Sequence, residues 1–185
     1  MPIAKSPAAR GKLGIRPIGA IVPEGQWLHT DLDLKEALEA KARKYGELQL
    51  PLIVAVNVLG LHCDEYDILN ALFGQEGITV SLRNDGSIAS EDAHRKQNGF
   101  WFGPKGRRNQ AVSAVLIFTG LNEWNMGSLI PELFHNPWAT YPLSTDCLPL
   151  RQNIPNMTTN RYDKRTGKIV QEVIGIPSPW PPSWD

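Results

Sequence analysis

Residues 52–58 read LIVAVNV, and Asn57 is the only polar residue among them. The run is short for a helix, it is rich in β-branched residues, and it is apolar on both faces of an extended chain. A strand of this kind is normally buried in the middle of a sheet that helices cover. We therefore predict a central strand at 52–58 and a fold of the α/β (or α+β) class, with a mixed sheet and few helices.

The residues before this strand predict a helix over 34–45. Asp33 and Glu36 have the spacing of a capping box, in which two side chains accept from free backbone N–H groups of the first turn. Gly46 follows, as a residue that adopts the left-handed conformation with which many helices end. The helix and the strand together form a predicted helix–strand unit at 34–58. One apolar stripe of the helix is formed by Leu34, Leu38, Ala42 and Tyr45.

The next part of the chain predicts a second helix over 65–73, with Asp64 as its N-cap and Gly74 at its end. Residues 84–86 read Asn-Asp-Gly, which is a strong turn signal. The polar residues 87–98 read as a loop. Three short apolar runs predict strands that extend the sheet with antiparallel pairing over 78–118, at 78–82, 100–102 and 112–118.

Composition divides the chain into three parts. Residues 1–30 are rich in proline, glycine and basic side chains and predict an arm, and residues 31–145 carry the α/β domain. Residues 146–185 predict a loop-rich end, with a hairpin over 161–174 and a tail rich in proline and tryptophan.

The formal net charge is zero, but the charges are segregated along the sequence. Residues 1–23 carry four basic side chains and no acid, residues 24–92 carry 13 acids against 5 bases, and residues 93–122 carry five bases and no acid. A neutral total is therefore compatible with an anionic partner on one face. No apolar run approaches the roughly 20 residues of a membrane helix, so we expect no membrane contact. The two distant cysteines, Cys63 and Cys147, favour free thiols in the cytoplasm.

Basic residues next to aromatic ones are the strongest sign of a binding surface. Five of them surround the aromatic run at 100–102, whose rings could stack on bases while the cations neutralise phosphates. Two lysines of the first predicted helix lie off its apolar stripe. The alternative is a buried aromatic strand between solvated loops, with solvated helix lysines. The candidate nucleic-acid-binding residues are Lys41, Lys44, Arg95, Lys96, Lys105, Arg107 and Arg108.

A second candidate site lies just after the strand at 52–58, where α/β proteins often bind ligands. Residues 62–67 gather several side chains of metal-ligand type, and no second cluster completes a ligand set, so no metal ligand or catalytic residue is assigned. Acids that cap the second helix and occupy its first turn explain the same residues without a site. His135, in a separate motif, is interpreted as a structural turn residue. The candidates near the strand end are Asn57, His62 and Asp64.

Distinctive motifs occur over roughly 10–143: RPIG at 16–19, the helix and strand blocks at 37–46 and 50–57, 99–103, VSAV at 112–115, and HNPW at 135–138. With these motifs the chain resembles a family of uncharacterised bacterial proteins. The upstream half of that family resembles the restriction-endonuclease-like PD-(D/E)xK fold, and the matched motifs lie downstream of its metal-binding acids. The resemblance implies that 34–58 completes such a fold, that its lysines approach DNA, and that Mg²⁺ binds when an upstream half or partner chain is present.

This sequence has no strand acids of the required kind before Leu34, so we expect no activity and no cofactor in this chain alone. The leading hypothesis is a C-terminal part of a nuclease-like bacterial protein that contacts a nucleic-acid backbone and completes the fold. One alternative is a protein-interaction or scaffold module that uses the aromatic residues of 124–141. Another is an independent metal-dependent hydrolase that uses the cluster at 62–67.

Overall fold

The structure is a computed structural model, and it describes residues 30–46, 48–59, 63–159 and 161–181. The predicted arm at 1–30 lies outside these residues except for Thr30, and His62 lies outside them as well. The described part of the chain folds as a mixed α/β structure, as predicted. It has one five-stranded sheet, two small two-stranded sheets and the helices α1 (Thr30–Ala42), α2 (Glu65–Phe73) and α3 (Val170–Ile174).

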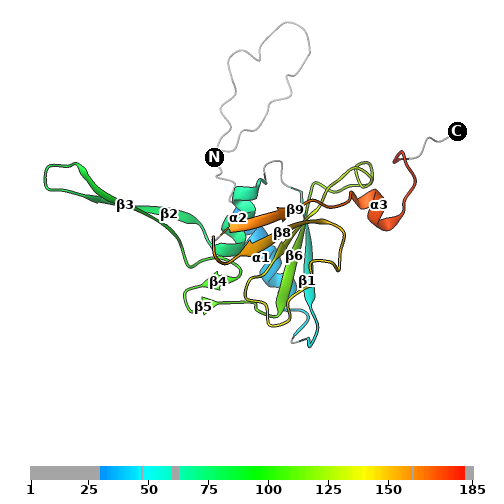
Figure 1. Cartoon of the computed structure of the whole chain (residues 1–185), viewed down its shortest axis with the longest axis horizontal. Coiled ribbons are helices and arrows are strands. Elements are labelled where there is room, and N and C mark those ends of the chain that lie inside the picture. Colours follow the sequence, from blue (N-terminus) through cyan, green and yellow to red (C-terminus); the bar gives the residue numbers. More distant parts are fainter. Residues whose placement is uncertain (1–29, 47, 60–62, 160, 182–185) are drawn as a thin grey trace, which may run out of the picture.

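The five-stranded sheet has the order β1-β6-β7-β8-β9 (Figure 1). Pairing alternates across it, because β1–β6 and β7–β8 are parallel whereas β6–β7 and β8–β9 are antiparallel. β1 has the bounds that the sequence predicts. Its neighbours come from segments far apart in the chain: β1 (Leu52–Val58), β6 (Val112–Thr119), β7 (Glu132–His135), β8 (Arg151–Asn156) and β9 (Arg161–Arg165).

The prediction that β1 is a central strand is wrong, because β1 forms one edge of the sheet. Val54 and Val56 are buried beneath the helices, whereas Ala55 and Asn57 are exposed. Strand β6, the neighbour of β1, is an interior strand, in which Val112 to Val115 are all buried. Ala55 and Asn57 alternate with the valines and lie on the solvated face, as an edge strand allows. Because alanine is small and apolar, the sequence of the strand looks apolar on both faces.

Helix α1 begins at Thr30, so Asp33 lies within its first turn and the predicted capping box with Glu36 is wrong. The helix ends at Ala42, and the chain turns through 43–45 to Gly46, whose φ is +61°. Helix α2 has the predicted bounds and cap. The Asp64 carboxylate accepts from the Asp67 N–H at 3.0 Å, and the Asp67 carboxylate accepts from the Asp64 N–H at 3.3 Å.

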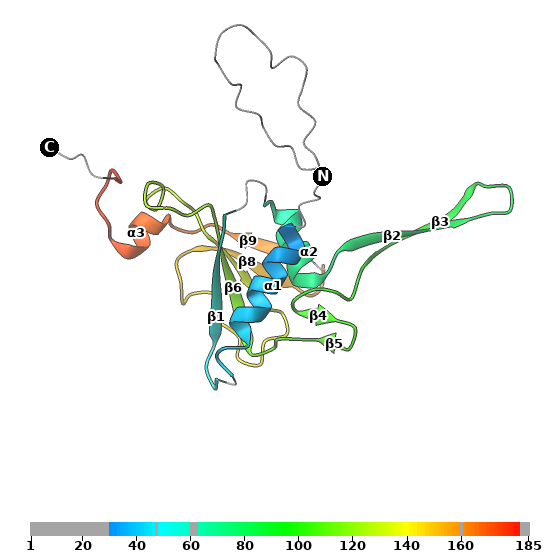
Figure 2. The ribbon, with the colours of Figure 1, turned by 180° about the vertical axis from the view of Figure 1, so that it is seen from behind.

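Both long helices pack on one face of the sheet, α1 against α2 and β1 (Figure 2). Phe100 and Trp101 are fully buried in the core between them, and they are not part of a strand, contrary to prediction. Their backbone N–H groups donate to the carbonyls of Ala71 and Leu72 at the end of α2, both at 2.8 Å. Only Phe102 and Gly103 are extended: they form β4 (Phe102–Gly103), which pairs with β5 (Gly106–Arg107) in a short hairpin.

A two-stranded ribbon projects from the body of the molecule in both views (Figures 1 and 2). It is called the arm from here on and is distinct from the N-terminal arm predicted at 1–30. It consists of β2 (Glu76–Leu82) and β3 (Ile88–Arg95), which pair with each other antiparallel across the predicted turn at 84–86. The loop predicted at 87–98 is therefore wrong. The antiparallel extension of the main sheet is also wrong, because β2–β3 and β4–β5 are separate small sheets and β6 is parallel to β1. Strand β3 reads IASEDAHR and is solvated on both faces, so it lacks the apolar alternation that marks a strand.

The main sheet continues past residue 146, since β8 and β9 pair with each other and β8 pairs with β7. The predicted hairpin over 161–174 is wrong, because β9 pairs with the strand before it and is followed by α3. No helix in the described ranges is long and apolar enough to cross a membrane.

Candidate functional site

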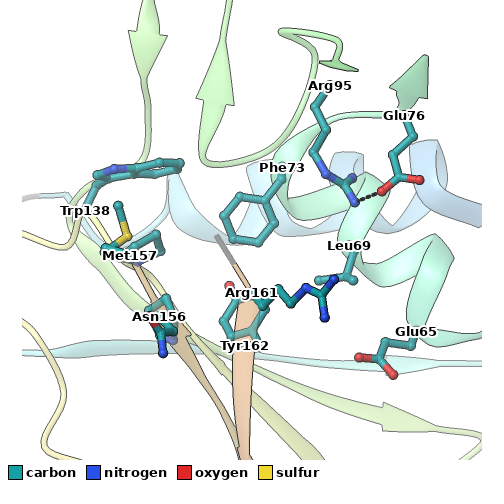
Figure 3. Close-up of a pocket in the computed structure, with 12 residues that line it drawn as sticks. Glu65, Leu69, Phe73, Glu76, Arg95, Trp138, Asn156, Met157, Arg161 and Tyr162 are labelled. Atoms are coloured by element: carbon teal, nitrogen blue, oxygen red, sulfur yellow. Dashed lines mark hydrogen bonds and ion pairs between the residues drawn. The ribbon is translucent and has the colours of Figure 1, made fainter. Parts of the chain in front are cut away.

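One feature that could hold a ligand is a groove of about 580 Å³ between α2, the base of the arm, the β8–β9 turn and the segment at 137–138. Figure 3 shows side chains from these elements converging on it. Such concave sites with an apolar lining and a few polar groups are the usual form of binding sites. The lining residues are Glu65, Leu69, Phe73, Glu76, Arg95, Pro137, Trp138, Pro155, Asn156, Met157, Arg161 and Tyr162.

Aromatic rings form the floor of this aromatic groove. The Phe73 ring lies between those of Trp138 and Tyr162, with centroids 5.9 and 5.7 Å away, and it also contacts the buried Trp101 at 5.4 Å. The Tyr162 hydroxyl donates to the carbonyl of His135 at 3.2 Å. Burial raises the pKa of Tyr162 well above its ordinary value, so this phenol stays neutral and the floor carries no charge.

The charged residues of the rim differ in their pairing. Arg95 forms an ion pair with Glu76 and donates to the Gly74 carbonyl at 2.8 Å, so it holds the base of the arm to the end of α2. Glu65 accepts from Lys164 of β9 at 2.6 Å. Arg161 is exposed and has no ion-pair partner in the described ranges, and in Figure 3 its guanidinium lies between the Tyr162 ring and Glu65. The rim therefore offers one uncompensated cation to a ligand.

The predicted basic residues are divided between structural and available positions. Arg95 has the anchoring role just described, and Arg108 pairs with Glu39 of α1 at 3.1 Å. Arg107 is not a lining residue of the groove, but it lies over the ring of Trp138, which is one, with its guanidinium carbon 5.8 Å from the ring centroid. The remaining four are exposed and have no hydrogen bond or ion pair from their side chains in the described ranges: Lys41, Lys44, Lys96 and Lys105.

The aromatic half of the sequence prediction needs correction. Phe100 and Trp101 are fully buried and cannot stack on a base, and only Phe102 is partly accessible. The ring beside the basic residues is instead Trp138, whose centroid lies 5.7 Å from that of Phe102. The local sequence does not predict the contacts of Trp138 with Phe102 and Arg107, because they form only in the tertiary fold.

The aromatic region at 124–141, predicted as a partner surface, does not form one accessible patch. Phe134 is fully buried in the core, and Trp138 faces the aromatic groove. Trp124 is 65% exposed, in the turn region that precedes β7, and Tyr141 is 38% exposed. The contrast between Trp124 and Trp138 makes the first a useful control for the second.

In the predicted cluster at 62–67, the aspartates that the structure describes make hydrogen bonds that stabilise the fold. Asp64 and Asp67 cap α2, and the Asn57 side chain bridges to the backbone of Leu121, accepting at 2.9 Å and donating at 2.8 Å. Burial, with the nearby Asp67 and Asp64 charges, raises the pKa of the Cys63 thiol to about 11, so at neutral pH it is protonated. The described residues contain no group of three or more His, Cys, Asp or Glu side chains that could hold a metal ion.

The chain matches no protein-family model, no curated protein and no solved structure. The resemblance to a nuclease-associated bacterial family therefore stays a prediction from the sequence motifs. The groove combines planar apolar rings with the exposed guanidinium of Arg161, and the Arg107 guanidinium lies over one of those rings, Trp138.

Proposed function

We propose that this chain binds nucleic acid, with a base on the floor of the aromatic groove and phosphates at its basic rim. The observation that supports the proposal is the guanidinium of Arg107 over the ring of Trp138, a tryptophan that lines a groove with an aromatic floor. Planar rings stack on bases of any sequence, and guanidinium groups neutralise the phosphates on either side.

The distribution of charge supports a polyanionic ligand. Residues 93–122 carry five bases and no acid, and the exposed Lys96 and Lys105 lie on either side of the aromatic segment. The two acids of the groove rim are compensated, Glu76 by Arg95 and Glu65 by Lys164. A phosphate beside Arg161 would therefore face little uncompensated negative charge.

The proposed role is binding and not cleavage by this chain alone. Asp64 and Asp67, the acids of the strongest predicted ligand cluster, bind backbone N–H groups of α2. Within the resemblance to a nuclease-associated family, Mg²⁺ and the metal-binding acids would come from an upstream half or a partner chain, and this chain would contribute backbone contacts.

The test is fluorescence anisotropy with a labelled single-stranded oligonucleotide and the matching duplex, titrated at several salt concentrations. We expect salt-sensitive binding that prefers the single strand, because an unpaired base can reach the groove. Trp138→Ala should weaken binding about ten-fold, equivalent to about 1.4 kcal/mol, because one stacked base contributes roughly 1–3 kcal/mol.

Two variants serve as controls. Trp124→Ala removes an exposed tryptophan that lies outside the groove lining, so it should leave the affinity unchanged. Arg107→Gln should reduce the slope of log affinity against log salt by about 0.7, the value for one single-strand phosphate contact. Equal affinities of the Trp138→Ala and parent proteins, or binding that salt does not weaken, would contradict the proposal.

A further inference from the structure

The arm presents an apolar surface that the proposed nucleic-acid site does not use. Every residue from 78 to 94 is exposed, and four large aliphatic side chains are among them. A two-stranded ribbon with no other support is marginally stable in water. The four side chains, here called the arm stripe, are Ile78 at 68%, Val80 at 46%, Leu82 at 64% and Ile88 at 52% exposure.

The strand register places the arm stripe on one face. Residues that are paired across an antiparallel ribbon point to the same side, and the side alternates along each strand. Ile78 pairs with Ala93, Val80 with Glu91 and, past a register shift between Ser81 and Leu82, Leu82 with Ile88. The aliphatic side chains of β2 therefore share one face, and the β3 side of that face also carries the Glu91 carboxylate. The opposite face carries Thr79 with Asp92 and Ser81 with Ser90, and it is polar.

Charge argues against nucleic acid or an anionic lipid surface as the occupant of this face. The arm from 76 to 95 has four carboxylates and two guanidiniums, so its net charge is −2. The acids Glu91 and Asp92 lie on β3, whereas β2 has no charged residue from 77 to 82. Charged residues or proline on an edge strand normally prevent it from pairing with another chain. Strand β3 carries such charges, whereas β2 has none from 77 to 82.

We propose that the arm stripe is a self-association surface, and that its occupant is the same stripe on a second copy of this chain. An identical aliphatic stripe along β2 on every copy is self-complementary about a two-fold axis, the commonest symmetry of oligomers, with Glu91 beside the stripe on β3. The exposed aliphatic surface is on the order of 400 Å² per copy, and backbone and neighbouring groups bring two copies to roughly 1,000 Å² in total. That is the size of a weak, reversible dimer, so we expect dissociation in the micromolar range.

Analytical ultracentrifugation of the full chain over about two decades of concentration tests the proposal. We expect a monomer–dimer equilibrium that Leu82→Lys weakens about ten-fold or more, because its cross-strand partner is Ile88 and the new charge is not compensated within the apolar contact. Ser81→Lys is the matched control: it adds the same charge to the preceding residue, on the polar face opposite Ser90, and should change the dissociation constant less than about two-fold. Matching thermal transitions of the parent and both variants, followed by far-UV circular dichroism, show that the fold is retained.

A cross-linking measurement follows the same surface without relying on destabilisation. In a Cys147→Ser background, Val80→Cys should form a disulfide-linked dimer under mild oxidation, and Thr79→Cys should not. Cys63 is half-buried with a pKa of about 11, so it does not compete. A monomer at every concentration, equal effects of the two lysine variants, or equal cross-linking at 79 and 80 would overturn the proposal. Nucleic-acid binding by a monomeric protein would leave the proposed function intact.

Discussion

At the scale of single residues, one buried polar network fixes both the end of β7 and the loop that covers the sheet. The Gln152 amide nitrogen donates to the carbonyls of Thr145 and Leu148, at 2.7 and 2.8 Å. Its oxygen is therefore free to accept from His135 Nε2, 2.7 Å away, which assigns the proton of the neutral imidazole to Nε2. His135 is 6% exposed, so its charged form would lose hydration that this network does not replace.

This network predicts how stability depends on pH. Burial lowers the pKa of His135 below its ordinary value of 6.5, so the unfolded chain binds this proton more readily than the folded chain. The free energy of unfolding should therefore fall as pH drops through about 6.5 and level off below the folded-state pKa. In urea titrations at pH 7.5 and at successively lower pH, His135→Gln should show a smaller loss than the parent. An equal loss in both proteins would show that other groups carry the dependence.

The sequence predicts a structural role for His135, but it does not identify Gln152 as its hydrogen-bond partner. The motif at 135–138 marks the end of a strand and a turn, which local pattern can indicate. Gln152 lies 17 residues away on β8, and only the parallel pairing of β7 with β8 brings the two side chains together. The same limit applies to Trp138 and Arg107, which only the tertiary fold brings together.

At the scale of elements, α2 shows what local sequence determines well. Its cap, its bounds and its final glycine all follow from residues within one turn of each end. Helix α1 shows the opposite: Asp33 has the spacing of a cap, but the helix begins three residues earlier. The buried Asp31 accepts from the Gln75 side chain at 2.8 Å, a tertiary contact that the capping pattern does not encode.

The difference between these two aspartates can be measured. Asp64→Ala should lower the free energy of unfolding by about 1 kcal/mol, because it leaves an N–H of the first turn of α2 without its side-chain acceptor. Asp33→Ala removes an exposed first-turn charge that is not a cap, and should cost about 0.3–0.5 kcal/mol. Urea denaturation of both variants gives the comparison. A larger loss for Asp33→Ala would mean that α1 is capped through Asp33 after all.

At the scale of the whole molecule, the sheet could not have been assembled from the sequence alone. Its strands come from 52–58, 112–119, 132–135, 151–156 and 161–165, and strand order depends on which faces remain to be covered. Local sequence predicts β1 and β6, because both are rich in valine and isoleucine. Strand β8, which reads RQNIPN, has no such pattern, and β9, which reads RYDKR, lies in the predicted hairpin at 161–174 but pairs with β8 instead of a strand after it.

The position of β8 and β9 in the sheet predicts that residues after 145 are needed for folding. A chain that ends at Asp146 would lose both strands, and it would expose Phe134 and leave His135 without Gln152. We expect such a truncation to lose its cooperative thermal transition, measured by circular dichroism. Ending the chain after Gly175 keeps all five strands and should preserve that transition. A cooperative transition in the shorter chain would show that β1, β6 and β7 suffice.

The ion pair of Glu76 with Arg95 belongs to two structures at once, because both residues line the aromatic groove and both are the first cross-strand pair of the arm. Arg95 also donates to the Gly74 carbonyl and to the Asn70 side chain, and the Glu76 N–H donates to the same side chain, so this guanidinium is one of the contacts that hinge the ribbon on the end of α2. A phosphate that competed for this guanidinium would loosen the hinge. Thermodynamic reciprocity then requires that whatever holds the arm in place also tunes the affinity of the groove. Ligand binding in the groove would then change the affinity of self-association through the arm, and self-association would change the ligand affinity by the same factor.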